Sequence, residues 1–294
     1  MTPHPSVTET ASEYRLYAIH YASSNLDRPL EHNFMAPVDL HDLPMPLEFF
    51  VWVAIGAGRI ILIDTGAEQH ICETRGHNYL RCPTEGLAAL GYTPDDVTDV
   101  VVTHMHWDHL GNLAKFPNAR IYVHKNEMSH ATGCAMCHAH LRRPYDVSQV
   151  CSLIVALYGG RVSFTEATAN IAPGIRVHHV GGHTPGLQVV QVQTRRGRVV
   201  VASDGLHYFA NSILSNPFPV IINVKDYLDG LSLIETLADS PDHVIPGHDP
   251  LVRMMYPSLP AAPYVINLTE APNTARPLDR AALLAAFGAQ LVQD

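Results

Sequence analysis

The hydrophobic and polar positions along the chain predict a series of short strands. Two β-branched and aromatic runs, at 48–55 and 59–64, are separated by Gly56-Ala57-Gly58, which is typical of a hairpin turn. Other apolar runs of similar length also predict strands. These further strands are expected at 14–20, 97–103, 119–123, 175–180, 187–194 and 198–202.

Apolar residues at helical spacing lie between the predicted strands. Thr84 precedes one such pattern and is suited to cap a helix, because its hydroxyl can accept a hydrogen bond from the first turn. The helices are predicted at 84–90, 109–115, 125–130, 225–239 and 279–292. Strands and helices therefore alternate in two sets. This order favours an α/β fold of the αββα sandwich type, in which two sheets pack together and helices lie outside.

The length of 294 residues is sufficient for one large core. We expect a single domain over residues 1–294, with its core at about 48–250, an N-terminal arm at 1–47 and a C-terminal helix at about 279–292. The segment 129–170 fits neither set of strands and helices. We expect it to be a partly helical, lid-like insertion that covers the functional site.

Composition narrows the classes of function. The net charge is −9 and no Lys/Arg run exceeds two residues, which disfavours a nucleic-acid partner. No apolar stretch is long enough to cross a membrane, and the polar N-terminus does not resemble a secretion signal, so we expect a cytoplasmic location. An odd set of 5 cysteines favours reduced thiols. The 19 histidines equal Lys plus Arg in number and direct attention to metal binding.

One histidine cluster is dense enough to predict a metal site. His104, His106, Asp108 and His109 place three imidazoles and a carboxylate directly after a β-branched run. Histidines two positions apart point the same way on an extended backbone. A turn at Trp107 would bring Asp108 and His109 to the other side of a shared cavity. The pattern therefore predicts ligands for two neighbouring metal ions.

This cluster resembles the signature of the metallo-β-lactamase superfamily. Four further elements of that signature, one before the cluster and three after it, occur in the family's order, and the resemblance spans roughly 48–249. It implies the family's fold, with two mixed β-sheets packed together and helices outside. The further elements are Asp64 in Leu62-Ile63-Asp64-Thr65-Gly66, His183 in Gly182-His183-Thr184-Pro185-Gly186, Asp204 in Ala202-Ser203-Asp204-Gly205, and His248 in Pro246-Gly247-His248.

The resemblance also implies a ligand set. One metal ion would be held by His104, His106 and His183, and the other by Asp108, His109 and His248. Asp204 would bridge the two ions. Asp64 would not touch the metals but would orient their ligands. Each ion would keep a position for a shared hydroxide, which two adjacent cations generate near neutral pH. Two divalent ions are expected, with zinc the first choice and iron, cobalt and manganese as alternatives.

Within the superfamily, the chain is most similar to the N-acyl-homoserine lactonase group and related bacterial lactonases. The similarity rests on 45–49, the His-Trp-Asp-His core at 106–109, 203–208 and 244–249. It implies a quorum-quenching or related enzyme in which the hydroxide between the metals opens a small-molecule lactone, including lactones formed during degradation of aromatic or heterocyclic compounds. Dimerisation is common in the group, so a homodimer stays an option.

The residues after Asp204 depart from this group. Its well-known members carry a tyrosine three residues after the bridging aspartate, where this chain has His207 followed by Tyr208. Either side chain could polarise the lactone carbonyl, and His207 could also assist proton transfer to the leaving oxygen. Together with Asp108 they are the candidate catalytic residues. The alternative is that His207 only packs near the site.

A second cluster, Cys134-x-x-Cys137-His138-x-His140, lies in the expected lid. Two cysteines with nearby histidines could form a further zinc site. The second ligand pair of such sites is missing, which favours a lid segment with free thiols.

Other functions remain as alternatives. A glyoxalase-II-like thioesterase shares the same metal ligands, and a non-enzymatic metal-binding protein would use the metal only structurally. A di-iron redox protein on this scaffold usually has a carboxylate at the position of His106. A β-lactamase is disfavoured by Asp108 and Asp204, and a nuclease by the charge balance.

Overall fold

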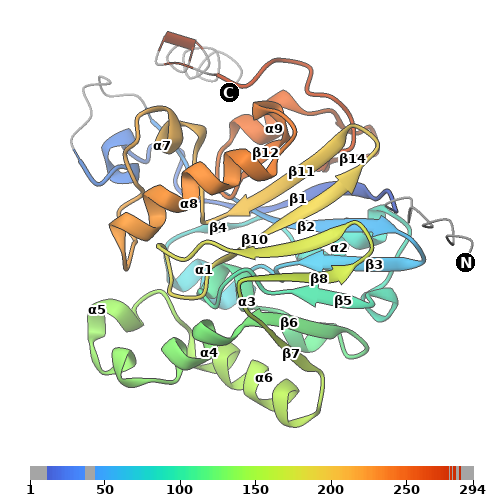
Figure 1. The fold of residues 1–294 in the computed structure, drawn as a ribbon, viewed down its shortest axis with the longest axis vertical. Helices are drawn as coiled ribbons and strands as arrows, with labels where there is room; N and C mark the ends of the chain where they lie inside the picture. Colours follow the sequence, from blue (N-terminus) through green and yellow to red (C-terminus); the bar gives the residue numbers. More distant parts are fainter. Residues whose placement is uncertain (1–11, 37–43, 278, 280, 283–284, 286–294) are drawn as a thin grey trace, which may run out of the picture.

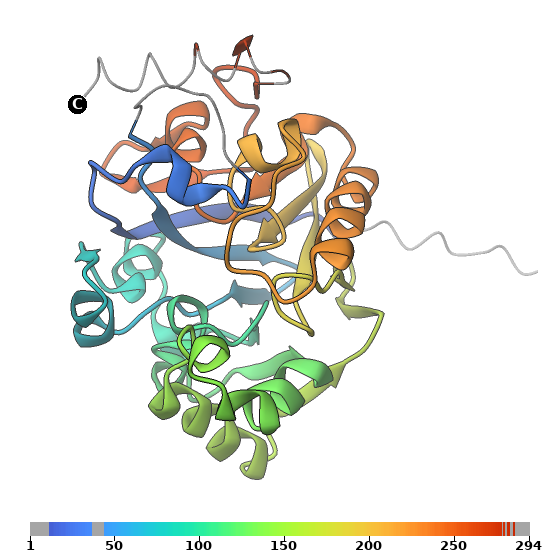
Figure 2. The ribbon, with the colours of Figure 1, turned by 90° about the vertical axis from the view of Figure 1, so that its left-hand side faces the viewer.

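Two β-sheets pack face to face, with helices on the outer side of each (Figures 1 and 2). The computed structural model describes residues 12–36, 44–277, 279, 281–282 and 285. The larger sheet has the order β13-β14-β1-β2-β3-β5-β6-β7, with β4 paired to β1. Its strands are β1 (Arg15–Ser23), β2 (Glu48–Gly56), β3 (Arg59–Ile63), β4 (Asn78–Tyr79), β5 (Asp99–Val101), β6 (Arg120–His124), β7 (Val162–Thr165), β13 (Ser258–Leu259) and β14 (Ala262–Asn267).

The smaller sheet has the order β12-β11-β10-β9-β8. Its strands are β8 (Thr168–Ala172), β9 (Ile175–His179), β10 (Gln188–Thr194), β11 (Gly197–Ser203) and β12 (Val244–Pro246). Both sheets are mixed, because β3, β5, β6 and β7 run parallel in one and β11 and β12 run parallel in the other. The remaining neighbours are antiparallel, as in the β2–β3 hairpin.

Nine α-helices and five short 3₁₀ helices lie within the described part of the chain. Both views place α4–α6 (green) and α7–α9 (orange) at opposite ends of the molecule (Figures 1 and 2). The α-helices are α1 (Gln69–Thr74), α2 (Pro83–Ala89), α3 (Trp107–Leu110), α4 (Lys125–Ala131), α5 (Ala139–Arg142), α6 (Val147–Tyr158), α7 (Phe209–Ile213), α8 (Val224–Leu237) and α9 (Leu251–Met255). The 3₁₀ helices are η1 (Leu30–Asn33), η2 (Pro94–Asp96), η3 (Leu113–Lys115), η4 (Cys134–Cys137) and η5 (Pro241–His243).

The apolar runs become strands because both faces of the large sheet are covered. In β2, Phe50 and Trp52 face the core between the sheets, whereas Phe49 and Val51 belong to the core under the outer helices. A strand buried on both faces is apolar at nearly every position. The outer face of the small sheet is covered by α8, whose Tyr227, Leu231 and Ile234 recur at helical spacing.

The predicted αββα arrangement of two mixed sheets is confirmed. The strand expected at 14–20 is β1, which lies between β14 and β2 within the large sheet. Most of the predicted C-terminal helix 279–292 lies outside the described residues. No helix in the described ranges is both long and apolar enough to cross a bilayer.

The predicted helix at 109–115 is wrong. Helix α3 already ends at Leu110, and η3 follows after a break. At Gly111 an added Cβ would lie 2.5 Å from the Gly66 carbonyl oxygen, and Asn112 has a left-handed φ of 53°. The chain turns sharply here because it must pass close to the loop after β3.

Candidate metal centre

Five loops of the two sheets converge on one buried cluster of histidines and aspartates. They follow β3, β5, β11 and β12, and connect β9 to β10. Loops at the carboxyl ends of strands are the usual place for ligands in α/β sheets. The side chains that they bring are Asp64, then His104, His106, Asp108 and His109, then His183, Asp204 and His248.

All seven side chains expected from the sequence as ligands are buried and lie together. His104, His106, His183 and Asp204 form one group, and Asp108, His109 and His248 form another, with ligand atoms within 4.8 Å inside each group. Asp204 reaches both groups. Its Oδ2 lies 3.2 Å from His183 Nε2, and its Oδ1 lies 2.9 Å from His248 Nε2.

Three of these histidines are oriented through their Nδ1 atoms. His109 Nδ1 lies 2.8 Å from Asp64 Oδ2, and His183 Nδ1 lies 2.6 Å from the Val220 carbonyl oxygen. His248 Nδ1 lies 2.9 Å from the Glu48 carbonyl oxygen. An N–H donated to each of these oxygens leaves the Nε2 lone pair free, which is the tautomer that binds metal.

The unpaired nitrogens of the cluster fit cations. His104 Nε2 and His109 Nε2 are buried without any hydrogen-bond partner among the described residues. His106 Nδ1 and His183 Nε2 lie 2.9 Å apart, and a shared cation would satisfy both. Buried polar atoms without partners cost free energy, so a donor set of imidazoles and carboxylates in this state suits divalent metal ions.

Burial also sets the charge state of the cluster. Desolvation lowers the pKa of His106 to about 3 and that of His104 well below its usual value. Burial opposes ionisation of Asp204, but His207, His248 and His109 hold its pKa well below the usual range. Burial also opposes the charged forms of His109 and His248, but the carboxylates of Asp204 and Asp108 raise the pKa of both, that of His109 well above its usual value. The cluster therefore combines neutral His104 and His106 with ionised carboxylates, and a bound metal ion would displace the protons of His109 and His248.

Asp64 links the loop after β3 to the histidine cluster. Its Oδ1 accepts a hydrogen bond of 2.7 Å from Thr103 N, and its Oδ2 accepts one of 2.7 Å from Thr103 Oγ1. The side chain is fully buried, and its backbone has a positive φ of 61°. Such backbone strain persists only where the surroundings fix it, and here it aims the carboxylate at Thr103 and His109.

Glu127 on α4 is a further residue of the site that the sequence analysis did not identify. Its fully buried carboxylate accepts hydrogen bonds from Met105 N (3.0 Å) and from Gly186 N (2.8 Å). Met105 lies between two of the clustered histidines, and Gly186 ends the loop that carries His183. Glu127 therefore ties the two loops together. No local sequence motif marks it.

His207 and Tyr208 have different surroundings. His207 Nε2 lies 3.0 Å from Asp204 Oδ2, and its ring stacks on Phe218 with centroids 3.9 Å apart. Tyr208 is fully buried and donates a hydrogen bond of 3.1 Å to the Pro46 carbonyl oxygen. It does not line the cavity described next. The expectation that Tyr208 could polarise a substrate is therefore corrected, because its side chain is committed to the N-terminal segment.

A cavity of about 650 Å³ opens onto the cluster. One side is apolar and includes Phe49, Trp107 and Phe218. His140, Leu141, Arg143, Pro144 and Tyr145 of the expected lid also line the cavity, whereas His138, Cys134 and Cys137 do not. The Tyr145 hydroxyl is buried without a partner in the described structure, and its ring lies 4.9 Å from that of His106.

The second cysteine and histidine cluster does not form a metal site within the described residues. Cys134 and Cys137 lie in η4 as exposed free thiols. Neither belongs to a group of three or more ligating side chains there, nor do His138 and His140. His140 instead lines the cavity.

The family model of the metallo-beta-lactamase superfamily matches residues 49–248. The chain belongs to this superfamily. The matched range includes every loop that contributes to the metal cluster. Family and cluster together define the chain as a metal-dependent hydrolase.

Curated relatives and solved structures agree with this assignment. An N-acyl homoserine lactonase of a Bacillus species is 25% identical over 219 residues, which cover 69% of this chain and 80% of the relative. N-acyl homoserine lactonase AiiB of Agrobacterium fabrum is 28% identical over 151 residues, covering 46% and 54%. A quorum-quenching N-acyl homoserine lactone lactonase has the same fold, with a TM-score of 0.66, 21% identity and coverage of 82% and 94%. A protein from Staphylococcus aureus described as a probable metal-dependent hydrolase gives a TM-score of 0.68 at 16% identity, covering 89% of this chain and 96% of the other.

Proposed function

We propose that this protein is a dinuclear metal-dependent lactonase. The observation that carries the proposal is the position of Asp204, whose two oxygens reach the two groups of histidines separately. The names of the curated relatives support a lactone as the substrate. His104, His106 and His183 would hold one ion, Asp108, His109 and His248 the other, and Asp204 both. Zinc fits this mixture of nitrogen and oxygen ligands best.

When bound, two such ions supply a water-derived nucleophile near neutral pH and polarise the substrate carbonyl. The chain's own residues position the ring beside them. Phe49, Trp107 and Phe218 provide an apolar surface for the substrate and exclude water. We infer that His207, which lines the cavity, exchanges its contact with Asp204 Oδ2 for the substrate and donates a hydrogen bond to the carbonyl oxygen, or a proton to the leaving oxygen of the opened ring.

A substrate panel tests the function. The metal-loaded protein is assayed in a pH-stat against γ-lactones, including N-acyl homoserine lactones, and against glutathione thioesters. We expect lactone hydrolysis that is abolished by a chelator and restored by zinc. Thioester cleavage without activity on any lactone would overturn the proposal in favour of a thioesterase.

Replacing His207 by phenylalanine tests the role of its imidazole. The new ring keeps the stacking on Phe218 but cannot donate a hydrogen bond. We expect kcat to fall about 10²-fold while the protein keeps two metal ions per chain. Tyr208→Phe is the matched control, because it removes only the hydroxyl that contacts Pro46, and its kcat should stay near that of the wild type. Loss of one metal ion in His207→Phe would show instead that His207 is a ligand.

A further inference from the structure

Four basic side chains line one part of the cavity at the metal cluster. They are Arg28, Arg75, Arg143 and His77, which we call the arginine wall. The carboxylates among the described lining residues are Asp108 and Asp204, and both belong to the metal cluster. No carboxylate of the described cavity lining is therefore left over to balance the three guanidinium charges.

The guanidinium groups of the wall are held by neutral partners. Arg75 donates hydrogen bonds to the carbonyl oxygens of Arg143 (2.9 Å) and Tyr145 (3.1 Å). Arg28 donates to Asn33 Oδ1 (2.8 Å) and to the carbonyl oxygen of His32 (3.1 Å). The Arg143 guanidinium has no hydrogen bond or ion pair within the described part of the chain.

Some arginines elsewhere in the molecule are paired with acids, whereas others, such as Arg81 and Arg161, donate to backbone carbonyl oxygens. Arg59 contacts Asp99 at 3.0 Å, Arg198 contacts Asp239 at 2.6 Å, and Arg253 contacts Glu48 at 3.1 Å. None of the wall's arginines has a carboxylate oxygen within 4.0 Å among the described residues. What distinguishes the arginine wall is that three arginines without an acidic partner line the same cavity beside the metal cluster.

Two members of the arginine wall lie against Trp107. The Arg75 Cζ atom lies 5.1 Å from the Trp107 ring centroid, and the His77 ring stacks on Trp107 at 5.3 Å. Burial lowers the pKa of His77; the Asp108 carboxylate opposes this shift, and the charges of Arg28, His248 and Arg75 add to it. Another part of the lining is apolar and runs from Phe218 to Ile222. The cavity therefore offers an apolar surface and a cationic surface to the same ligand.

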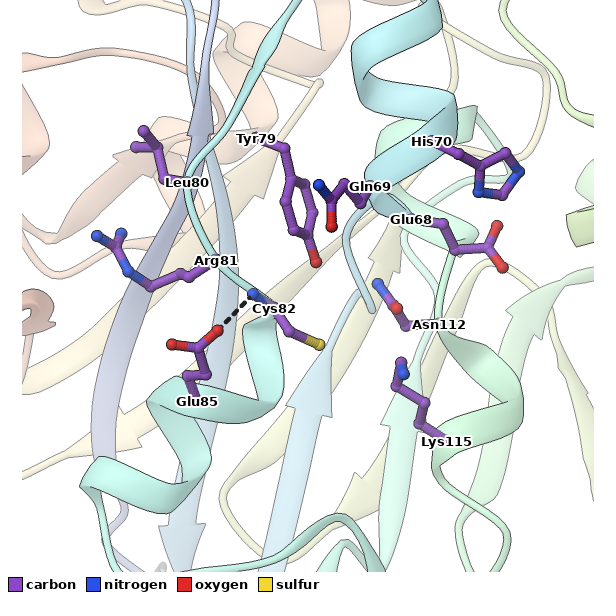
Figure 3. A pocket seen from close by; sticks show the side chains of 10 residues that line it. All are labelled: Glu68, Gln69, His70, Tyr79, Leu80, Arg81, Cys82, Glu85, Asn112 and Lys115. Carbon is purple, nitrogen blue, oxygen red and sulfur yellow. Dashed lines mark hydrogen bonds between the residues drawn. The ribbon is translucent and has the colours of Figure 1, made fainter.

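A second hollow provides a contrast (Figure 3). It lies between α1 and α2, and its lining includes the acids Glu68 and Glu85 as well as the bases Arg81 and Lys115. Glu85 accepts a hydrogen bond from Cys82 N (3.0 Å), and Arg81 donates one to the His20 carbonyl oxygen (2.6 Å). With both signs present, this hollow has no preference for an anion.

We propose that the substrate of the metal centre is an anionic lactone, whose side chain ends in a carboxylate that binds the arginine wall. The proposal rests on the proposed lactonase function and specifies its substrate class. Guanidinium groups pair with carboxylates through charge-assisted hydrogen bonds, and Arg143 has all its donors available. A neutral acyl chain would use the apolar surface but would leave the three charges uncompensated.

Two matched lactones test the proposal. N-hexanoyl and N-adipoyl homoserine lactone have acyl chains of equal carbon number, and only the adipoyl chain ends in a carboxylate. We expect kcat/KM of the zinc-loaded protein to be about 10-fold higher for the adipoyl compound at low ionic strength. This preference should shrink as salt is added, because the charge interaction is screened. Equal values, or a preference for the hexanoyl compound, would overturn the proposal.

Two neighbouring arginines supply the matched variants. Arg143 lines the cavity, whereas Arg142 is also exposed, donates to the Met136 carbonyl oxygen and does not line it. We expect Arg143→Gln to lower the adipoyl-to-hexanoyl ratio of kcat/KM about 5-fold and Arg142→Gln to leave the ratio unchanged. The same adipoyl-to-hexanoyl ratio of kcat/KM in both variants would contradict a role of Arg143 in binding the substrate carboxylate.

A binding measurement separates this inference from the proposed function. Calorimetry with the two ring-opened products, N-hexanoyl and N-adipoyl homoserine, needs no turnover. Tighter binding of the adipoyl product that is lost in Arg143→Gln supports carboxylate binding by the arginine wall. If neither lactone is hydrolysed in that case, only the lactonase proposal fails. Equal binding of both products, with lactone hydrolysis intact, would overturn only the inference that the arginine wall binds a substrate carboxylate.

Discussion

Replacing Asp204 by alanine should abolish stable binding of at least one metal ion and lower kcat/KM for a lactone about 10³-fold or more. Asp204 is the described residue that reaches both groups of ligands, with Oδ1 at 2.9 Å from His248 Nε2 and Oδ2 at 3.2 Å from His183 Nε2. Its removal leaves neighbouring cations without the negative charge between them. Repulsion between two divalent ions then opposes joint occupancy.

Metal content and kinetics measured on the same preparation check this prediction. Native mass spectrometry gives the number of ions per chain, and a pH-stat gives kcat/KM. Asp249→Asn is the control, because Asp249 is also fully buried but accepts its hydrogen bonds from Phe209 N and Leu251 N. The control should keep both ions. An Asp204→Ala protein with two ions and wild-type kinetics would contradict the proposed bridging role.

Replacing Asp64 by alanine should weaken metal binding 10- to 100-fold, about the effect known for residues that orient metal ligands. It should also lower the free energy of unfolding by about 3 kcal/mol, because Thr103 N and His109 Nδ1 would lose a buried charged acceptor. Both effects are expected because the Asp64 carboxylate contacts both Thr103, which precedes the histidine cluster, and His109 within it.

Asp64→Asn separates the two effects. The amide keeps the shape and tolerates the positive φ of 61°, so it should recover part of the stability. It cannot accept hydrogen bonds at both terminal atoms, so the orientation of His109 and the metal affinity should stay impaired. Urea unfolding measures stability, and competition with a chromophoric chelator measures affinity. Unchanged affinity in both variants would show that Asp64 does not act on the ligands.

The metal cluster could be predicted because its residues occupy short loops directly after strands. The sequence of 104–109 specifies three imidazoles and a carboxylate at fixed spacing, and turns of this kind are determined locally. His183, Asp204 and His248 join this group only through the fold. Their positions were therefore inferred from the resemblance to a family, and not from spacing.

Three features could not be predicted because they depend on distant contacts. The place of β1 between β14 and β2 is set by pairing between the two ends of the chain. Which of His207 and Tyr208 faces the cavity depends on the start of α7, where Tyr208 turns toward Pro46. The role of Glu127 depends on two backbone N–H groups that lie 22 and 59 positions away in the sequence.

The carboxylate of Glu127 constrains how this enzyme can diversify. Helix α4 carries Glu127 and is followed by η4 and α5. The end of α5 and the residues after it, up to Tyr145, contribute to the lining of the cavity. Sequence changes that reshape this segment to admit new substrates would also shift α4. They would thereby disturb the hydrogen bonds from Met105 N and Gly186 N to Glu127. Changes of specificity in this segment are therefore expected to alter metal affinity, and so are changes near Val220, because its carbonyl oxygen orients His183.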